Sequence, residues 1–154
     1  MLWNRILLIY DGSEGALRAT EYVAKMFGQT EGVQVTIYGL HEKIPRHDLK
    51  DTSPVVEKLQ TKLSAMEIEI ERGQRRILES KKLLAKAGMD ESAIQVKYLE
   101  RKQSAIKEIA TEADQGEYGT LVVGRNEHSQ GVLAGGNVVK DLVNQIKDRA
   151  VLVV

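Results

Sequence analysis

The sequence predicts a single α/β domain over residues 1–154, a doubly wound fold in which helices cover both faces of a five-stranded parallel sheet. Three observations support this fold class. Segments with the pattern of a strand alternate along the chain with segments that have the pattern of a helix. The strand-like segments are rich in Val, Ile and Leu on both faces, which is typical of strands buried between two helical layers. No internal repeat or low-complexity tract indicates a second domain.

The N-terminal part supplies the first two strands and the first helix. The apolar segment 5–10 is the first expected strand, and it stops at Asp11 and a turn. Ser13 is the expected N-cap of a helix over 14–27, because its hydroxyl can accept a hydrogen bond from a free backbone N–H of the first turn. A second strand is expected over 33–40.

The C-terminal part continues the alternation. Short runs rich in Val, Ile and Leu predict strands over 94–99, 120–123 and 150–154. Apolar residues at helical spacing predict helices over 104–114 and 137–146.

The segment 54–87 is expected to be one unusually long helix, with Pro54 in its first turn and Gly88 after its last residue. Large apolar residues recur every seven positions, at Val56, Leu63, Ile70, Ile77 and Leu84. A second position of the same seven-residue repeat holds Leu59, Met66, Gly73, Ser80 and Ala87, so this second seam has no large apolar residue after Met66. We therefore expect the helix to lie on the sheet with its first half and to project at one end. The alternative is a partial coiled-coil contact with a second chain, or another protein partner on this helix.

Composition excludes several classes of protein. Lys and Arg together number 22, as do Asp and Glu, so the net charge of zero argues against a general binder of nucleic acids or membrane surfaces. The absence of cysteine excludes disulfides, thiolate zinc sites and thiol nucleophiles. No apolar stretch reaches the roughly 20 residues of a membrane span. The N-terminus lacks the layout of a signal peptide, so a cytoplasmic protein is expected.

The strand ends and one glycine pair indicate a nucleotide pocket. The first strand stops at Asp11, the fourth stops at Gly124, and Gly135 and Gly136 open the last helix. Strand ends and helix N-termini meet at one edge of a parallel sheet, where backbone N–H groups can face a phosphate. The sequence therefore predicts a nucleotide site between the first and fourth strands.

Several stretches of the chain carry a family resemblance. They are YDGSE at 10–14, VTIYGL at 35–40, YGTLVVGR at 118–125, LAGGNVVKDL at 133–142 and AVLVV at 150–154. In this order and spacing they resemble the universal stress protein family over nearly the whole chain. The resemblance implies the strand order 3-2-1-4-5 and a homodimer joined through the last strand, 150–154. One branch of that family binds ATP with a loop written G-x2-G-x9-G-S/T, and another branch lacks the motif and the ligand.

Carried over by position, the resemblance implies a set of nucleotide-binding residues. Asp11 would lie at the ribose, and the backbone of Leu40 would meet the adenine. Gly124 and Arg125 would begin the phosphate loop. The residues that would close this loop are Gly135, Gly136, Asn137 and Val138.

This chain departs from the family's phosphate motif at three points. Glu127 stands where the second glycine is expected, Gly135 comes two residues early, and Gly136 replaces the hydroxyl residue. A carboxylate beside a triphosphate repels it by roughly 1 kcal/mol. Against this, Gly131, Gly135 and Gly136 still allow close approach of the backbone, and Arg125 could supply positive charge. ATP or ADP is expected as ligand, with Mg²⁺ only alongside a nucleotide, and a degenerate loop without ligand is the alternative.

Enzyme classes find little support in the sequence. There is no G-x-S-x-G elbow, no G-x-x-x-x-G-K-S/T loop and no G-x-G-x-x-G after the first strand. No catalytic residues and no metal site are predicted, although Glu127 or Asp11 could act as base in a slow ATPase. The leading hypothesis is a cytoplasmic, homodimeric stress-response or signalling module that senses adenine nucleotides. The alternative is an interaction protein without a nucleotide.

Overall fold

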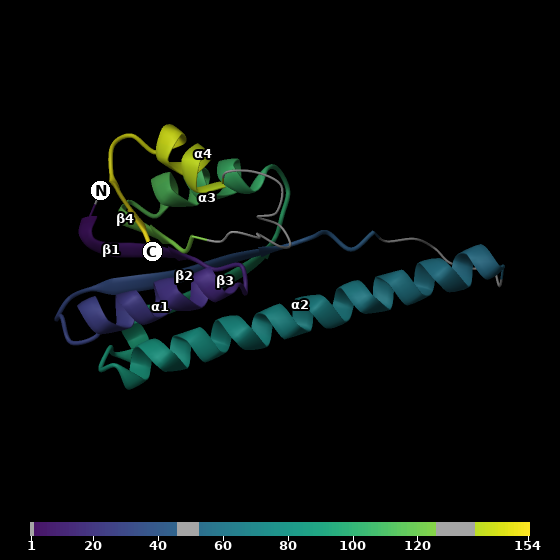
Figure 1. The fold of residues 1–154 in the computed structure, drawn as a ribbon, viewed down its shortest axis with the longest axis horizontal. Coiled ribbons are helices and arrows are strands. Elements are labelled where there is room, and N and C mark those ends of the chain that lie inside the picture. Colours follow the sequence, from purple (N-terminus) through teal and green to yellow (C-terminus); the bar gives the residue numbers. More distant parts are fainter. Residues whose placement is uncertain (1, 46–52, 126–137) are drawn as a thin grey trace.

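The predicted α/β architecture is present in the computed structural model, which describes residues 2–45, 53–125 and 138–154 (Figure 1). The element bounds are β1 (Leu2–Ile9), α1 (Glu14–Phe27), β2 (Gln34–His41), α2 (Pro54–Lys86), the 3₁₀ turn η1 (Glu91–Ala93), β3 (Ile94–Glu100), α3 (Ala105–Gln115), β4 (Tyr118–Val123), α4 (Val138–Gln145) and β5 (Ala150–Val153). Each helix and strand lies within three residues of the range expected from the sequence, and η1 was not expected.

The five strands form one sheet in the order β3-β2-β1-β4-β5, and every neighbouring pair is parallel. The central strand is β1, in which Leu8 pairs with Ile37 of β2 and with Val122 of β4. The fold class and the strand order are therefore confirmed.

The alternation of side chains along β1 explains why its apolar run is continuous. Ile6 and Leu8 face the cluster under α1 and α2, whereas Leu7 and Ile9 face the cluster under α3 and α4. All four side chains are at most 2% exposed. Successive side chains of a strand point to opposite faces, so a strand covered on both sides must be apolar at every position. Figure 1 shows the two helical layers on either side of the sheet.

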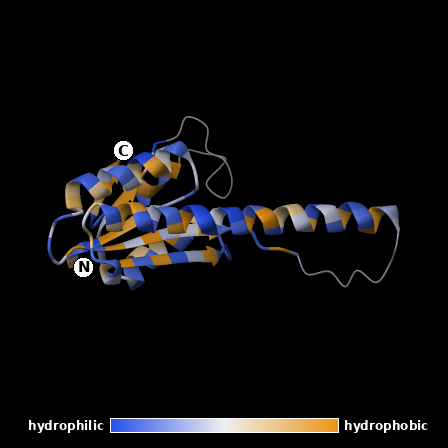
Figure 2. Ribbon diagram, turned by 90° about the horizontal axis from the view of Figure 1, so that it is seen from below, coloured by the Kyte–Doolittle hydropathy of each residue, from blue (hydrophilic) through white to orange (hydrophobic). Residues whose placement is uncertain are grey.

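Helix α2 is much longer than the sheet, and its two halves have different surroundings. Its buried residues are Ile77, Ser80 and Leu84, and no residue over 54–76 is buried. Figures 1 and 2 show the N-terminal half extending beyond the sheet. A long helix that projects at one end was expected, but with its first half on the sheet, and that orientation was wrong. The connection 87–93 is too short to separate the helix end from β3, whereas 42–53 can reach a distant helix start.

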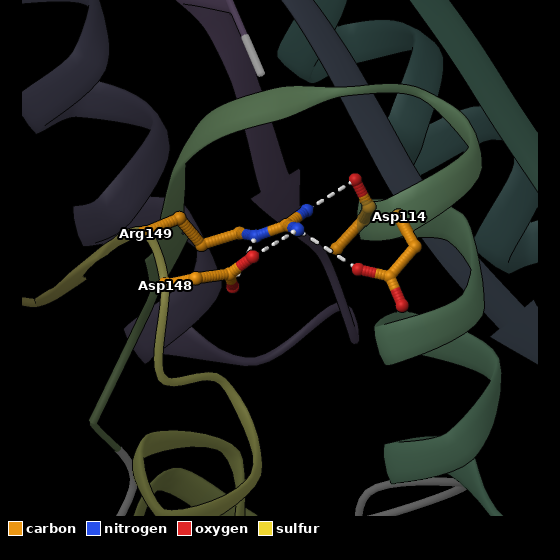
Figure 3. Close-up of polar contacts among 4 residues, drawn as sticks. Asp114, Asp148 and Arg149 are labelled. Carbon is orange, nitrogen blue, oxygen red and sulfur yellow. Dashed lines mark hydrogen bonds and ion pairs between the residues drawn. The ribbon is translucent and has the colours of Figure 1, made fainter.

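A buried arginine fastens β5 to the end of α3 (Figure 3). The side chain of Arg149 is 6% exposed, and its guanidinium donates to the backbone carbonyl of Ala113. The same group pairs with Asp114 at 2.8 Å and with Asp148 at 3.1 Å. This arrangement holds the last strand at the sheet edge.

Candidate functional site

A cavity of about 420 Å³ opens at the carboxyl ends of β1 and β2. The ends of these strands, Tyr98 of β3, Ile109 of α3 and one face of α2 form its walls. Parallel α/β sheets bind ligands at this edge. Small-molecule sites have volumes of roughly 300–1,000 Å³, so the cavity has room for a small ligand.

Asp11 lies in this cavity, directly after β1 and before α1. Its Oδ1 accepts a hydrogen bond from the backbone N–H of Ser13 at 3.0 Å and another from the Ser13 hydroxyl. The Ser13 Oγ in turn accepts from the N–H of Ala16 at 3.1 Å, which makes Ser13 the N-cap of α1, as expected. Asp11 is half-buried and is held in place by the turn that starts α1.

Leu40 lies in the same cavity, on β2. The next residue, His41, presents its ring to Tyr98 of β3, with the ring centroids 5.0 Å apart and tilted by 57°. Burial raises the pKa of the Tyr98 phenol above its ordinary value, and the nearby carboxylate of Glu69 raises it further. The strand side of the cavity therefore combines an aliphatic side chain with two aromatic rings.

The described residues of the expected phosphate loop lie outside the lining of this cavity. Gly124 packs on the first turn of α1, where a Cβ atom would overlap the carbonyl group of Gly15 and lie 2.7 Å from the Ala16 nitrogen. The backbone N–H of Arg125 donates to the Val154 carbonyl at 2.6 Å.

The Arg125 carbonyl accepts a hydrogen bond from the Arg18 guanidinium at 2.6 Å. Val138 begins α4 and packs against the cluster under α3 and α4. The predicted residues Gly135, Gly136 and Asn137, together with Glu127, lie outside the described residues. The structure thus brings Asp11 and Leu40 together. The site was expected between the first and fourth strands, but among the described residues none from β4 lines this cavity.

Comparison with known protein families gives a match over almost the whole chain. The model of the universal stress protein family matches residues 3–154. The chain belongs to the universal stress protein family. A comparison with curated protein sequences gives no match.

Solved structures of universal stress proteins share this fold. A member from Burkholderia pseudomallei aligns with a TM-score of 0.66 at 15% identity, covering 99% of this chain and 96% of that one. The protein from Archaeoglobus fulgidus in complex with dAMP has a TM-score of 0.57 at 16% identity, with 99% and 98% covered. An Arabidopsis thaliana member with AMP bound has a TM-score of 0.54 at 13% identity, with 97% and 90% covered.

In this universal stress protein, α2 supplies a wall of the cavity that sequence reasoning missed. Gly73 stands in the helix where a Cβ atom would lie 2.9 Å from Cζ of Tyr98 and overlap its hydroxyl oxygen. Arg76 is exposed and lines the cavity beside Gly12. A glycine inside a helical pattern marks a close approach, so Gly73 was the available signal.

Two further findings concern metals and membranes. Among the described residues, no group of three His, Cys, Asp or Glu side chains is placed to hold a metal ion. None of the helices in the described part of the chain is both long and apolar enough to cross a bilayer.

Proposed function

We propose that this universal stress protein binds an adenine nucleotide in the cavity at the carboxyl ends of β1 and β2, as a sensing or signalling module. One observation carries the proposal. Asp11 and Leu40, which the family resemblance assigns to the ribose and the adenine, line the same cavity.

The chemistry of the walls suits a nucleoside. Leu40, Met66 and Ile70 supply apolar surface, and Tyr98 supplies an aromatic ring on which a flat base can pack. The carboxylate of Asp11 can accept hydrogen bonds from sugar hydroxyls. Two universal stress proteins of the same fold carry dAMP and AMP, which supports an adenine ligand here.

Calorimetric titration with adenosine, AMP, ADP and ATP, with and without Mg²⁺, tests the proposal. We expect binding of at least one adenine nucleotide. Asp11→Ala should weaken it by about 1–2 kcal/mol, because hydrogen bonds from the sugar to a charged acceptor are lost. Glu21→Ala is the matched control, since Glu21 is an exposed carboxylate of α1 outside the cavity. Absence of binding by all four compounds would refute the proposal.

A second candidate function is an interaction module without nucleotide, favoured by the exposed sheet edge. Strand β5 is the last strand of the sheet, and Val151, Leu152 and Val153 on it are only half-buried. Edge strands of this kind pair readily with a copy of themselves. We propose a homodimer joined through β5.

Sedimentation velocity at tens of micromolar protein tests the dimer. The wild type is expected to sediment as a dimer, and Leu152→Lys as a monomer, because a charge on an edge strand opposes pairing. Circular dichroism establishes that the variant is folded. A folded Leu152→Lys variant that still dimerises would place the interface elsewhere.

A further inference from the structure

Arg76 closes the cavity beside the candidate ribose contact. A Cβ atom built on Gly12 would lie 3.4 Å from Nη1 of Arg76 and 3.8 Å from its Cδ. The arginine side chain therefore covers Gly12, the residue that follows Asp11. Asp11 and Arg76 both line the cavity.

The backbone that carries Arg76 is firmly placed. The next residue, Ile77, is fully buried, and Ser80 one turn further on is 3% exposed. Arg76 thus stands at the point where α2 leaves the sheet, on the anchored half of the helix.

The charges around the cavity leave Arg76 available for a ligand. Glu42 pairs with Arg101 at 2.9 Å, and Glu69 pairs with Arg72 at 2.8 Å. Oδ1 of Asp11 accepts the two hydrogen bonds of Ser13 described above. Within the described residues, Arg76 makes no hydrogen bond or ion pair of its own. An anion entering the cavity would meet this guanidinium.

We propose that Arg76 binds the phosphate of an adenine nucleoside monophosphate whose sugar lies at Asp11, so that the cavity prefers AMP to adenosine. A guanidinium presents paired N–H donors that match the oxygens of a phosphate. The positive charge that meets the phosphate would come from α2. The sequence of this chain has Glu127 where the family's phosphate motif has its second glycine. This inference rests on the proposed nucleotide function and assigns the phosphate contact within it.

The test compares two neighbouring arginines of α2. Both arginines are exposed, but Arg76→Gln removes a charge that lines the cavity, whereas Arg75→Gln removes the same charge from a position that does not line it. Titration calorimetry measures AMP and adenosine binding to each variant. The wild type should bind AMP about tenfold more tightly than adenosine, and Arg76→Gln should lose this preference while keeping its adenosine affinity. Arg75→Gln should behave as the wild type.

Three outcomes would overturn the inference. Arg76→Gln that weakens AMP and adenosine equally would show a role in the shape of the cavity and not in phosphate binding. A wild type that binds both compounds equally would leave the nucleotide function standing without a phosphate contact at Arg76. A wild type that binds neither AMP nor adenosine would overturn this inference, whereas the nucleotide proposal fails only if ADP and ATP do not bind either. NMR titration with inorganic phosphate then tests the anion contact alone, since only such a contact would shift the Arg76 Nε–H signal and leave that of Arg75 unchanged.

Discussion

Gly124→Ala isolates the packing role of a glycine that the family resemblance assigns to phosphate binding. Gly124 follows β4 directly, and a Cβ atom there would overlap the Gly15 carbonyl in the first turn of α1. Backbone atoms of two elements meet at this point, so no side chain can rotate away to make room. Alanine must therefore push the end of β4 away from α1.

The expected cost follows from the overlap. Forcing an extra methyl group into a packed site costs about 1–3 kcal/mol, and contact with backbone on a rigid helix turn favours the upper end. Replacing glycine with alanine also restricts the unfolded chain, which offsets about 0.4–1 kcal/mol. The net loss in unfolding free energy should be about 2 kcal/mol. For a domain of this size, that lowers the melting temperature by about 4–8 °C.

Urea denaturation followed by circular dichroism measures this loss, and Gly32→Ala is the control. Gly32 has φ of +77° and nothing within 4 Å of its virtual Cβ, so its alanine variant carries only backbone strain. That strain costs about 1–2 kcal/mol, and the restriction of the unfolded chain by alanine offsets part of it. The net loss in unfolding free energy is therefore roughly 1 kcal/mol. A Gly124→Ala variant no less stable than Gly32→Ala would refute the packing argument.

Three further predictions concern Arg149, the buried tyrosines and Glu127. Arg149→Met should lower the unfolding free energy by about 1–3 kcal/mol in urea titrations, because the buried Ala113 carbonyl loses its donor. Burial raises the pKa of Tyr10 and Tyr118 above 10.0, so the folded protein keeps protons that the unfolded chain releases. The contribution of these tyrosines to stability should therefore be constant below about pH 10 and fall above it, and their phenols should ionise late when followed at 295 nm. Glu127→Gly should strengthen ATP binding by about 1 kcal/mol in calorimetry, and an unchanged affinity would argue against phosphate near that position.

The sequence was sufficient for the order and type of the elements, because their signals are local. Ser13 was expected to cap α1, and its hydroxyl does accept from the Ala16 N–H. The start of β1 was placed at residue 5, whereas the strand begins at Leu2. Asn4 and Arg5 separate Leu2 and Trp3 from the apolar run that begins at Ile6, so the sequence pattern did not extend the strand to Leu2, although Leu2 pairs with Tyr118.

The far wall of the cavity could not be predicted, because it depends on where α2 lies relative to the sheet. Periodicity shows which face of a helix is apolar, but it does not show which half is covered. Arg72, Arg75 and Arg76 look alike in the sequence. Only the position of α2 separates Arg76, which lines the cavity, from Arg72, which pairs with Glu69 on an exposed surface.

The weak second seam of α2 is explained by its packing on the sheet. The small residues of that seam, Gly73, Ser80 and Ala87, occupy the part of the helix that meets the sheet: Gly73 accommodates the ring of Tyr98, Ser80 is buried, and Ala87 packs against the core. Of the larger residues of that seam, Leu59 belongs to the N-terminal half of the helix, which extends past the sheet, and Met66 lines the cavity; both are half-exposed. Small residues permit close approach to the sheet, and large apolar residues on the overhang supply surface that the described part of the chain leaves uncovered. A partner for α2 is therefore proposed for its N-terminal half alone, because the C-terminal half already has the sheet as its partner.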